Sequence, residues 1–230
     1  MNWRDTPIHV TNRDNLDRGF RRLVAWLRQA GHGNITVIDN GSTWPPLLAF
    51  YDKSPELNVL RLTTNMGPYA FWHLGMQVQQ AAPFVVTDPD VVPAVACPSD
   101  LVERMLWAME TLPATPCKVG PSLRVDNLPA HYRLHKEVVA WESQWWQRTV
   151  TVGESVVAYD ALIDTTFALY KAGSGSWPSE GTHYRLAPPY ELEHVPWYED
   201  SRHPSEEAAY YREHIDTQWT HWTKLEGVTK

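Results

Sequence analysis

The stretch Phe84-Val-Val-Thr-Asp88-Pro-Asp90-Val-Val-Pro93 decides the fold that this sequence predicts. Its β-branched apolar residues are typical of a buried strand, which delivers two carboxylates to its carboxyl end. Side chains two positions apart on an extended chain point the same way, and Pro89 favours an extended Asp88. Two hard oxygen ligands in this place suit Mg²⁺ or Mn²⁺ carrying a substrate phosphate. An acidic turn is the alternative, because Asp and Pro are ordinary turn residues.

Upstream of this stretch, strand-like and helix-like segments alternate. The hydrophobic pattern predicts strands at 7–11, 34–38 and 58–62, and helices at 16–27, 46–51 and 69–80. Such alternation with short connections predicts a mostly parallel sheet with helices on both faces. Ligands of these sheets bind beyond the carboxyl ends of the strands. We therefore expect the polar clusters at 11–13, 39–43, 65–67 and 88–90 to meet at one edge.

The second half of the sequence is less regular. We expect helices at 101–112 and around Val138, Trp141 and Trp145, and strands at 118–125, 156–159 and 164–170. Ser205 is expected to cap a final helix with Glu206 and Glu207 near its N-terminus. The expected buried stripe of that helix is Tyr211, Ile215, Trp219 and Trp222.

Composition narrows the class of protein. The chain has 230 residues, enough for one large domain, and its net charge of −7 argues against general polyanion binding. Cys97 and Cys117 form no metal-type pair, which is typical of reduced thiols in a cytoplasmic protein. The first residues are polar, with no apolar signal-peptide core, and no stretch approaches the ~20 apolar residues needed to span a bilayer. A soluble, cytoplasmic protein is the expectation.

Taken together, these residues give the chain a resemblance to glycosyltransferases of the GT-A fold, close to the large family 2. It runs from Pro7 to about Tyr198. The matching parts are Thr11-Asn-Arg13, Val37-Ile-Asp-Asn-Gly-Ser42, Asn65-Met-Gly67, Thr87-Asp-Pro-Asp90, Ile163-Asp-Thr-Thr-Phe-Ala-Leu-Tyr170 and His194-Val-Pro-Trp-Tyr198. Their order and spacing support the resemblance. It implies an α/β fold with a Rossmann-like, mostly parallel central sheet. One domain, 1–230, would comprise a nucleotide-sugar half (1–110), an acceptor half (111–200) and a C-terminal helix (201–230).

The resemblance also implies how a nucleotide-sugar donor is held. Its nucleoside, most often uridine in this fold, would be bound by Thr11, Asn12, Arg13 and Asp39, with Asn65 and Gly67 nearby. Alternatives from the residues alone are a turn closed by Asp39, a surface ion pair of Arg13 and simple turn geometry at Gly67.

A divalent ion would bridge the donor's diphosphate. Asp90, helped by Asp88, is the expected ligand, and the resemblance suggests His194 as the third. A lone histidine can equally be structural. Mn²⁺ tolerates imidazole better than Mg²⁺ does, which favours manganese. The ion would neutralise charge on the leaving nucleotide.

An inverting transferase also needs a base for the acceptor hydroxyl. Asp164 is the first candidate, with a strand-entry turn as its alternative, and Glu142 is the second, with a solvated helix charge as its alternative. The family's usual acidic base motif is not obvious, so inversion and retention both stay open.

The acceptor side is expected to include Arg124, Asp126, His131, Trp141, Trp145 and Trp177. Core packing is the alternative for the three tryptophans, and a solvated face for the basic segment 131–136. A carbohydrate or glycolipid acceptor is the first expectation. A phage-type DNA glycosyltransferase acting on a hydroxymethylated base is the second, and a non-catalytic sugar-nucleotide or glycan-binding module is the reading from another class.

Overall fold

The computed structural model describes residues 2–174, 177 and 181–215. Its strands are β1 (Ile8–Asn12), β2 (Ile35–Asp39), β3 (Asn58–Arg61), β4 (Phe84–Thr87), β5 (Val91–Pro93), β6 (Lys118–Leu123), β7 (Thr149–Val152), β8 (Ser155–Asp160), β9 (Ala168–Tyr170) and β10 (His183–His194). Its helices are α1 (Phe20–Gln29), α2 (Pro45–Asp52), α3 (Ala70–His73), α4 (Leu101–Thr111), α5 (His135–Ser143) and α6 (Glu206–His214). Short 3₁₀ turns are η1 (Trp3–Asp5), η2 (Met76–Gln79), η3 (Gln144–Trp146) and η4 (Val195–Tyr198).

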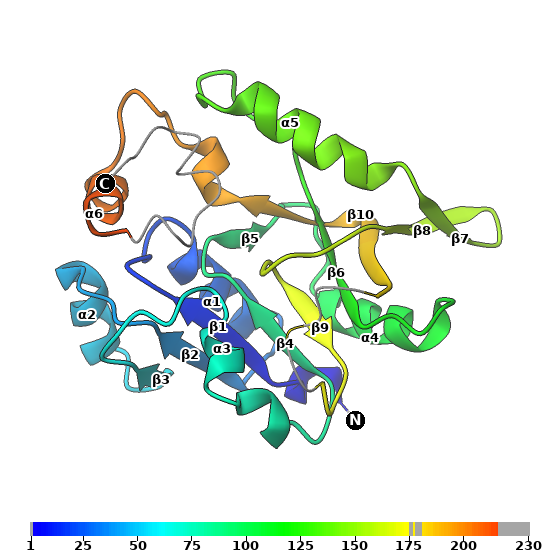
Figure 1. Ribbon diagram of the computed structural model, residues 1–230, viewed down its shortest axis with the longest axis horizontal. Coiled ribbons are helices and arrows are strands. Elements are labelled where there is room, and N and C mark those ends of the chain that lie inside the picture. The colour runs from blue at the N-terminus through cyan, green and yellow to red at the C-terminus, as the bar shows by residue number, and fades with distance from the viewer. Residues whose placement is uncertain (1, 175–176, 178–180, 216–230) are drawn as a thin grey trace.

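All of these strands join one ten-stranded sheet with the order β3-β2-β1-β4-β9-β6-β10-β8-β7, and β5 pairs with β10 (Figure 1). The first four strands in chain order pair in parallel, β1 between β2 and β4. The later strands add antiparallel pairs, because β9 runs against both β4 and β6, and β8 runs against β10. The predicted α/β class, a sheet flanked by helices, is confirmed.

Hydrophobic residues on both faces explain why this sheet is covered on both sides. Strand β1 places Ile8 and Val10 in the core shared with α1 and α4. Its His9 points the other way, where its ring lies 4.7 Å from that of Phe71 in α3 and 6.4 Å from that of Phe84. Parallel strands buried on both faces are expected to read as continuous apolar runs, as β4 does.

The structure corrects several predicted elements. The helix predicted at 69–80 is divided into α3 and η2 at Gly75, whose φ of +68° leaves the helical region. The strand predicted at 164–170 is confined to β9, so that Asp164 lies on the preceding loop. Strands β5, β7 and β10 were not predicted. In β10 the register shifts between Leu186 and Glu191, around Pro188-Pro189.

The predicted cap of the final helix is present in α6. The side chain of Ser205 accepts a hydrogen bond of 3.1 Å from the N–H of Ala208. Ile215 is buried just beyond the helix, whereas Trp219 and Trp222 lie outside the described residues. Helix α6 lies beside α2, while the β7–β8 hairpin projects at the opposite end of the sheet (Figure 1). Within the described part of the chain, no helix combines the length and apolar character needed to cross a membrane.

Candidate functional site

One cavity of about 430 Å³ opens at the carboxyl ends of β1 and β4 and beside the end of β10. The predicted site residues that line it are Thr11, Arg13, Asn65, Gly67, Asp88, Asp90, Trp141, Glu142, Asp164 and His194. They come from both halves of the sequence. The strand order therefore brings most of the predicted donor, metal and base residues to one place.

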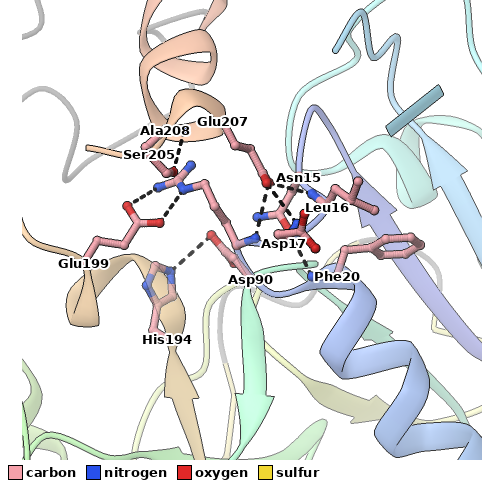
Figure 2. Close-up of polar contacts among 11 residues, drawn as sticks. Asn15, Leu16, Asp17, Phe20, Asp90, His194, Glu199, Ser205, Glu207 and Ala208 are labelled. Atoms are coloured by element: carbon pink, nitrogen blue, oxygen red, sulfur yellow. Dashed lines mark hydrogen bonds and ion pairs between the residues drawn. The ribbon is translucent and has the colours of Figure 1, made fainter. Parts of the chain in front are cut away.

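Asp90 and His194 face each other at this cavity (Figure 2). The Nε2 atom of His194 lies 3.6 Å from Oδ2 of Asp90. Strand β5 begins directly after Asp90 and pairs with the end of β10, so that Val91 stands opposite His194. The N–H of Val195 also donates to the carbonyl oxygen of Asp90 at 2.8 Å. Backbone pairing thus fixes the approach of two side chains far apart in the sequence.

Asp88 is enclosed by other acidic groups. Its Oδ2 accepts a hydrogen bond of 2.8 Å from the hydroxyl of Thr165. Burial, and then the carboxylates of Asp90 and Asp164, raise the pKa of Asp88 well above its ordinary value, against the effect of Thr165. No three His, Cys, Asp or Glu side chains of the described residues are already gathered as a metal site. The role of Asp88, Asp90 and His194 as ligands stays a prediction.

Asn12 and Asp39 do not line the cavity, although both were predicted to bind the nucleoside. Asn12 is fully buried, and its amide donates to the hydroxyl of Tyr51 at 2.8 Å. A carboxylate oxygen of Asp39 accepts the N–H of Ser42 at 3.2 Å and closes the turn after β2. Burial raises the pKa of Asp39. Both residues support the loops from beneath, and direct contact with a nucleotide stays a prediction.

Asn40 organises the loops that border the cavity after β1, β2 and β3, a role that the sequence did not reveal. Its side-chain nitrogen donates to Oδ1 of Asn65 and to the carbonyl oxygen of Gly67, each at 2.9 Å. Its carbonyl oxygen accepts a bond of 3.1 Å from the guanidinium of Arg13. The predicted residues Arg13, Asn65 and Gly67 are therefore tied into one network. An asparagine in a strand-to-helix turn was the available signal.

Gly19 was also missed, and it sets how closely the loop after β1 approaches the Asp90 turn. Its φ is +147°, and a Cβ there would lie 2.6 Å from the Cα of Asp90 and 2.7 Å from the carbonyl oxygen of Pro89. No side chain fits this space. Gly67 has a φ of +76°, so the predicted turn geometry is present there as well.

Asp164, the first candidate base, is exposed at the cavity. Its Oδ1 accepts the N–H of Thr166 at 3.0 Å, which is the turn geometry given as its alternative. Below this loop the fully buried Lys118 donates from Nζ to the carbonyl oxygen of Ile163 at 2.9 Å. The ring of Trp177 lies 3.7 Å from the same ammonium group. Burial lowers the pKa of Lys118 to about 7, against the raising effect of Asp164. Lys118 was not predicted.

Glu142 is not the solvated charge given as its alternative, because its side chain is only 3% exposed. Its Oε2 accepts a bond of 2.6 Å from the guanidinium of Arg185 in β10, which also donates to the carbonyl oxygen of Leu162 at 2.8 Å. Burial raises the pKa of Glu142, and Arg185 opposes that effect. Since the carboxylate is engaged, we interpret Glu142 as the residue that fastens α5 to the sheet and not as the base.

The predicted acceptor residues are spread over the second half. Trp141 is 46% exposed and lines the cavity, so it is not part of a buried stripe. The ring of Trp145 lies 6.1 Å from that of Trp141, and Trp177 packs against Tyr69 and Lys118. Outside the cavity lining are Arg124 and Asp126, which form an ion pair of 2.6 Å, and the exposed His131.

The loop after β1 and the C-terminal segment supply site residues that sequence reasoning missed. The cavity lining also includes Arg18, Glu199, Ser201, Tyr211, Arg212 and Ile215. Two nitrogens of the Arg18 guanidinium donate to the two carboxylate oxygens of Glu199 at 2.7 and 3.1 Å. The Tyr211 ring lies 5.3 Å from the same guanidinium. The loop position of Arg18 after a strand was a signal for it, whereas the others depend on how the segment after β10 packs.

No protein-family model and no curated protein matches the sequence. The structure is similar to S. aureus TarS 1–349, with a TM-score of 0.51 at 13% identity, covering 82% of this chain and 60% of that one. The same protein with UDP-GlcNAc gives 0.51 at 13% identity, with 83% and 60% covered. The mannosyltransferase PcManGT from Pyrobaculum calidifontis, with GDP-Man and Mn²⁺, gives 0.49 at 14% identity, with 90% and 59% covered. That score is too low to support an inference.

The chain spans about 60% of the length of the TarS structures. At this low identity the likeness concerns the fold alone. The fold is GT-A-like.

Proposed function

We propose that this chain is a metal-dependent glycosyltransferase that moves a sugar from a UDP-sugar to a hydroxyl group of a carbohydrate or glycolipid. The observation that carries the proposal is the meeting of Asp88, Asp90, His194 and Asp164 at one cavity. TarS, whose fold is similar, has been crystallised with UDP-GlcNAc and with UDP, which supports a UDP-sugar as the donor.

The residues present suit a divalent ion. Asp90 and His194 offer an oxygen and a nitrogen ligand on one side of the cavity, and Asp88 adds a second carboxylate. The Nδ1 atom of His194 is buried and has no hydrogen-bond partner among the described residues, which leaves Nε2 as the atom directed at Asp90. An imidazole in the set favours Mn²⁺ over Mg²⁺. When bound, the ion would supply Lewis-acid stabilisation of the leaving diphosphate.

The chain's own residues would perform the remaining steps. Arg13 and Arg18 line the cavity as cations for the donor's phosphates. The oxygen of the acceptor hydroxyl bonds to the anomeric carbon of the donor sugar while the bond from that carbon to the β-phosphate oxygen breaks. Asp164 accepts the proton that the hydroxyl group loses. UDP leaves with the bonding electrons. The exposed ring of Trp141 offers a platform for the acceptor sugar.

Charge favours a glycan over DNA as the acceptor. Three arginines on the surface of the second half pair with carboxylates, in Arg124–Asp126, Arg148–Asp160 and Arg202–Asp200. These pairs reduce the positive field that a polyanion needs.

A titration of tryptophan fluorescence with UDP, with and without Mn²⁺, tests the proposal on the wild type and Asp90→Asn. We expect Mn²⁺-dependent binding that weakens about 100-fold in the variant, because one charged ligand is lost. Asp160→Asn, a carboxylate outside the cavity lining, is the control. Wild type that binds no UDP under any metal condition would refute the UDP donor. Tight binding independent of both Mn²⁺ and Asp90 would favour a non-catalytic sugar-nucleotide module.

A further inference from the structure

Glu207, in the first turn of α6, is buried against the loop that follows β1 (Figure 2). Its Oε1 accepts the N–H of Leu16 at 2.6 Å and that of Arg18 at 3.3 Å, and its Oε2 accepts the N–H of Asp17 at 2.9 Å. Burying a carboxylate is unfavourable unless hydrogen bonds replace its water. These bonds to consecutive backbone groups do so, and they join segments about 190 residues apart.

The loop that Glu207 holds belongs to the nucleotide end of the cavity, which we define as the end lined by Arg13, Arg18, Asn40 and Asn65, where the proposed donor would bind. Arg13, Asn15 and Arg18 of this loop line the cavity. Loop N–H groups have no partner in a regular helix or sheet, so a fixed acceptor is needed to order them. Asn15 orders the next part, because its Oδ1 accepts the N–H of Phe20 at 3.0 Å where α1 begins. Glu207 therefore holds the backbone of Arg18 directly.

Helix α6 also contacts the loop between β2 and α2. The hydroxyl of Tyr210 donates to Oγ1 of Thr43 at 3.0 Å, and the rings of Tyr210 and Trp44 lie 4.6 Å apart. From the same helix Tyr211 and Arg212 line the cavity. One helix thus holds both loops that border the nucleotide end and forms a wall of that end itself.

We propose that Glu207 is a positioning residue for donor binding: its carboxylate holds the backbone of 16–18 against α6 and so positions Arg18 for the donor's diphosphate. This inference rests on the proposed function. Substitution of Glu207 should affect nucleotide binding and not the proton transfer, because the candidate base Asp164 lies on another loop. Loss of the Glu207 carboxylate weakens nucleotide binding, and an amide of the same shape, which keeps one oxygen acceptor, restores part of it.

The test compares the full chain as wild type, Glu207→Ala and Glu207→Gln, with the exposed neighbour Glu206→Ala as the matched control. Hydrogen exchange reports on the amides of 16–18, and a UDP titration with Mn²⁺ reports on binding. For Glu207→Ala we expect about tenfold faster exchange and about tenfold weaker UDP binding, the size of one or two lost hydrogen bonds. Glu207→Gln should lose about threefold in each, and Glu206→Ala should match wild type.

Each other outcome is decisive. Unchanged hydrogen exchange at 16–18 in Glu207→Ala would refute the claim that Glu207 orders this backbone. Faster exchange with unchanged UDP affinity would refute the positioning role and leave the proposed function intact. Wild type that binds no UDP would refute the UDP donor of the proposed function, and this inference with it. If near-ultraviolet circular dichroism shows Glu207→Ala to be unfolded, the comparison of Glu207→Gln with Glu206→Ala decides, because Gln preserves the shape.

Discussion

The two halves of the site are built differently. At the nucleotide end, buried carboxylate and amide side chains bond to the backbone of neighbouring loops. Asp14 is an example, because its Oδ1 accepts the N–H groups of Thr43 and Trp44 at 2.6 and 2.7 Å. On the acceptor side, single buried cations hold the loops and helices. Lys118 is fully buried, and Arg185 is 4% exposed.

This difference suggests how each half responds to change. Loop networks with several backbone bonds lose binding gradually when one partner is removed. A buried cation has no such redundancy, since removing its partner leaves an uncompensated charge. We therefore expect substitutions on the acceptor side to affect turnover or stability sharply while leaving nucleotide affinity intact.

The largest effect is expected for Asp164→Asn. Asparagine keeps an oxygen that can accept the N–H of Thr166, so the loop is preserved while the proton acceptor is lost. Turnover should fall on the order of 10³-fold, within the usual range for a general base. UDP affinity should stay within about twofold of wild type, because the donor loops are untouched.

Steady-state kinetics with the donor at saturation measures turnover, and a UDP titration measures nucleotide affinity. Asp160→Asn, a carboxylate outside the cavity lining with no predicted role in the site, is the control and should be near wild type. Unchanged turnover in Asp164→Asn would place the base elsewhere. A large loss of UDP affinity would show that the two halves are not separable.

Breaking the buried ion pair is the next largest expected effect. Glu142→Gln should lower the free energy of unfolding by about 3 kcal/mol, because Arg185 is left buried without a counter-charge. The double variant Glu142→Leu/Arg185→Met should recover most of this loss, since both charges are then absent.

Urea unfolding of the two variants and of wild type gives these free energies. If Glu142→Gln abolished turnover at unchanged stability, Glu142 would be a base and our interpretation of it would be wrong. A double variant as unstable as Glu142→Gln would mean that packing, and not charge, accounts for the loss.

The parallel part of the fold could be predicted from the sequence because its signals are local. The strands around Val10, Val37 and Val85 are β-branched runs that end in turn residues. Once those strands are placed in a parallel sheet, the rule for their carboxyl ends brings Thr11, Asn65 and Asp88 together. No knowledge of distant contacts is needed for this step.

The rest depends on pairing between distant segments, which local patterns do not encode. Strand β10 contains Pro188-Pro189, and prolines argue against an interior strand. Strand β5 has three residues, too few for a periodic signal. The place of His194 opposite Val91 follows from these two strands, so only the family resemblance suggested it. Glu207 likewise depends on where α6 packs.

The smallest expected effect is a change in how the free energy of unfolding depends on pH. Burial lowers the pKa of Lys118 from 10.5 to about 7. Between these values the unfolded chain binds a proton that the folded chain does not, so the free energy of unfolding should rise with pH in this window. The linkage limit is about 1.4 kcal/mol per pH unit for one proton. Because methionine cannot titrate, we expect the slope to be lower in Lys118→Met by about 1 kcal/mol per pH unit.

Urea unfolding at several values between pH 7 and 9 measures the slope, with the exposed Lys136→Met as the matched control that should keep it. Parallel curves for wild type and Lys118→Met would mean that Lys118 keeps its ordinary pKa after folding. Burial would then not disfavour the charged form of Lys118 on the acceptor side. Loss of the slope in Lys118→Met alone would show that burial disfavours the charged form of Lys118. The same side chain would still support the loop of Asp164 through its hydrogen bond to the carbonyl oxygen of Ile163.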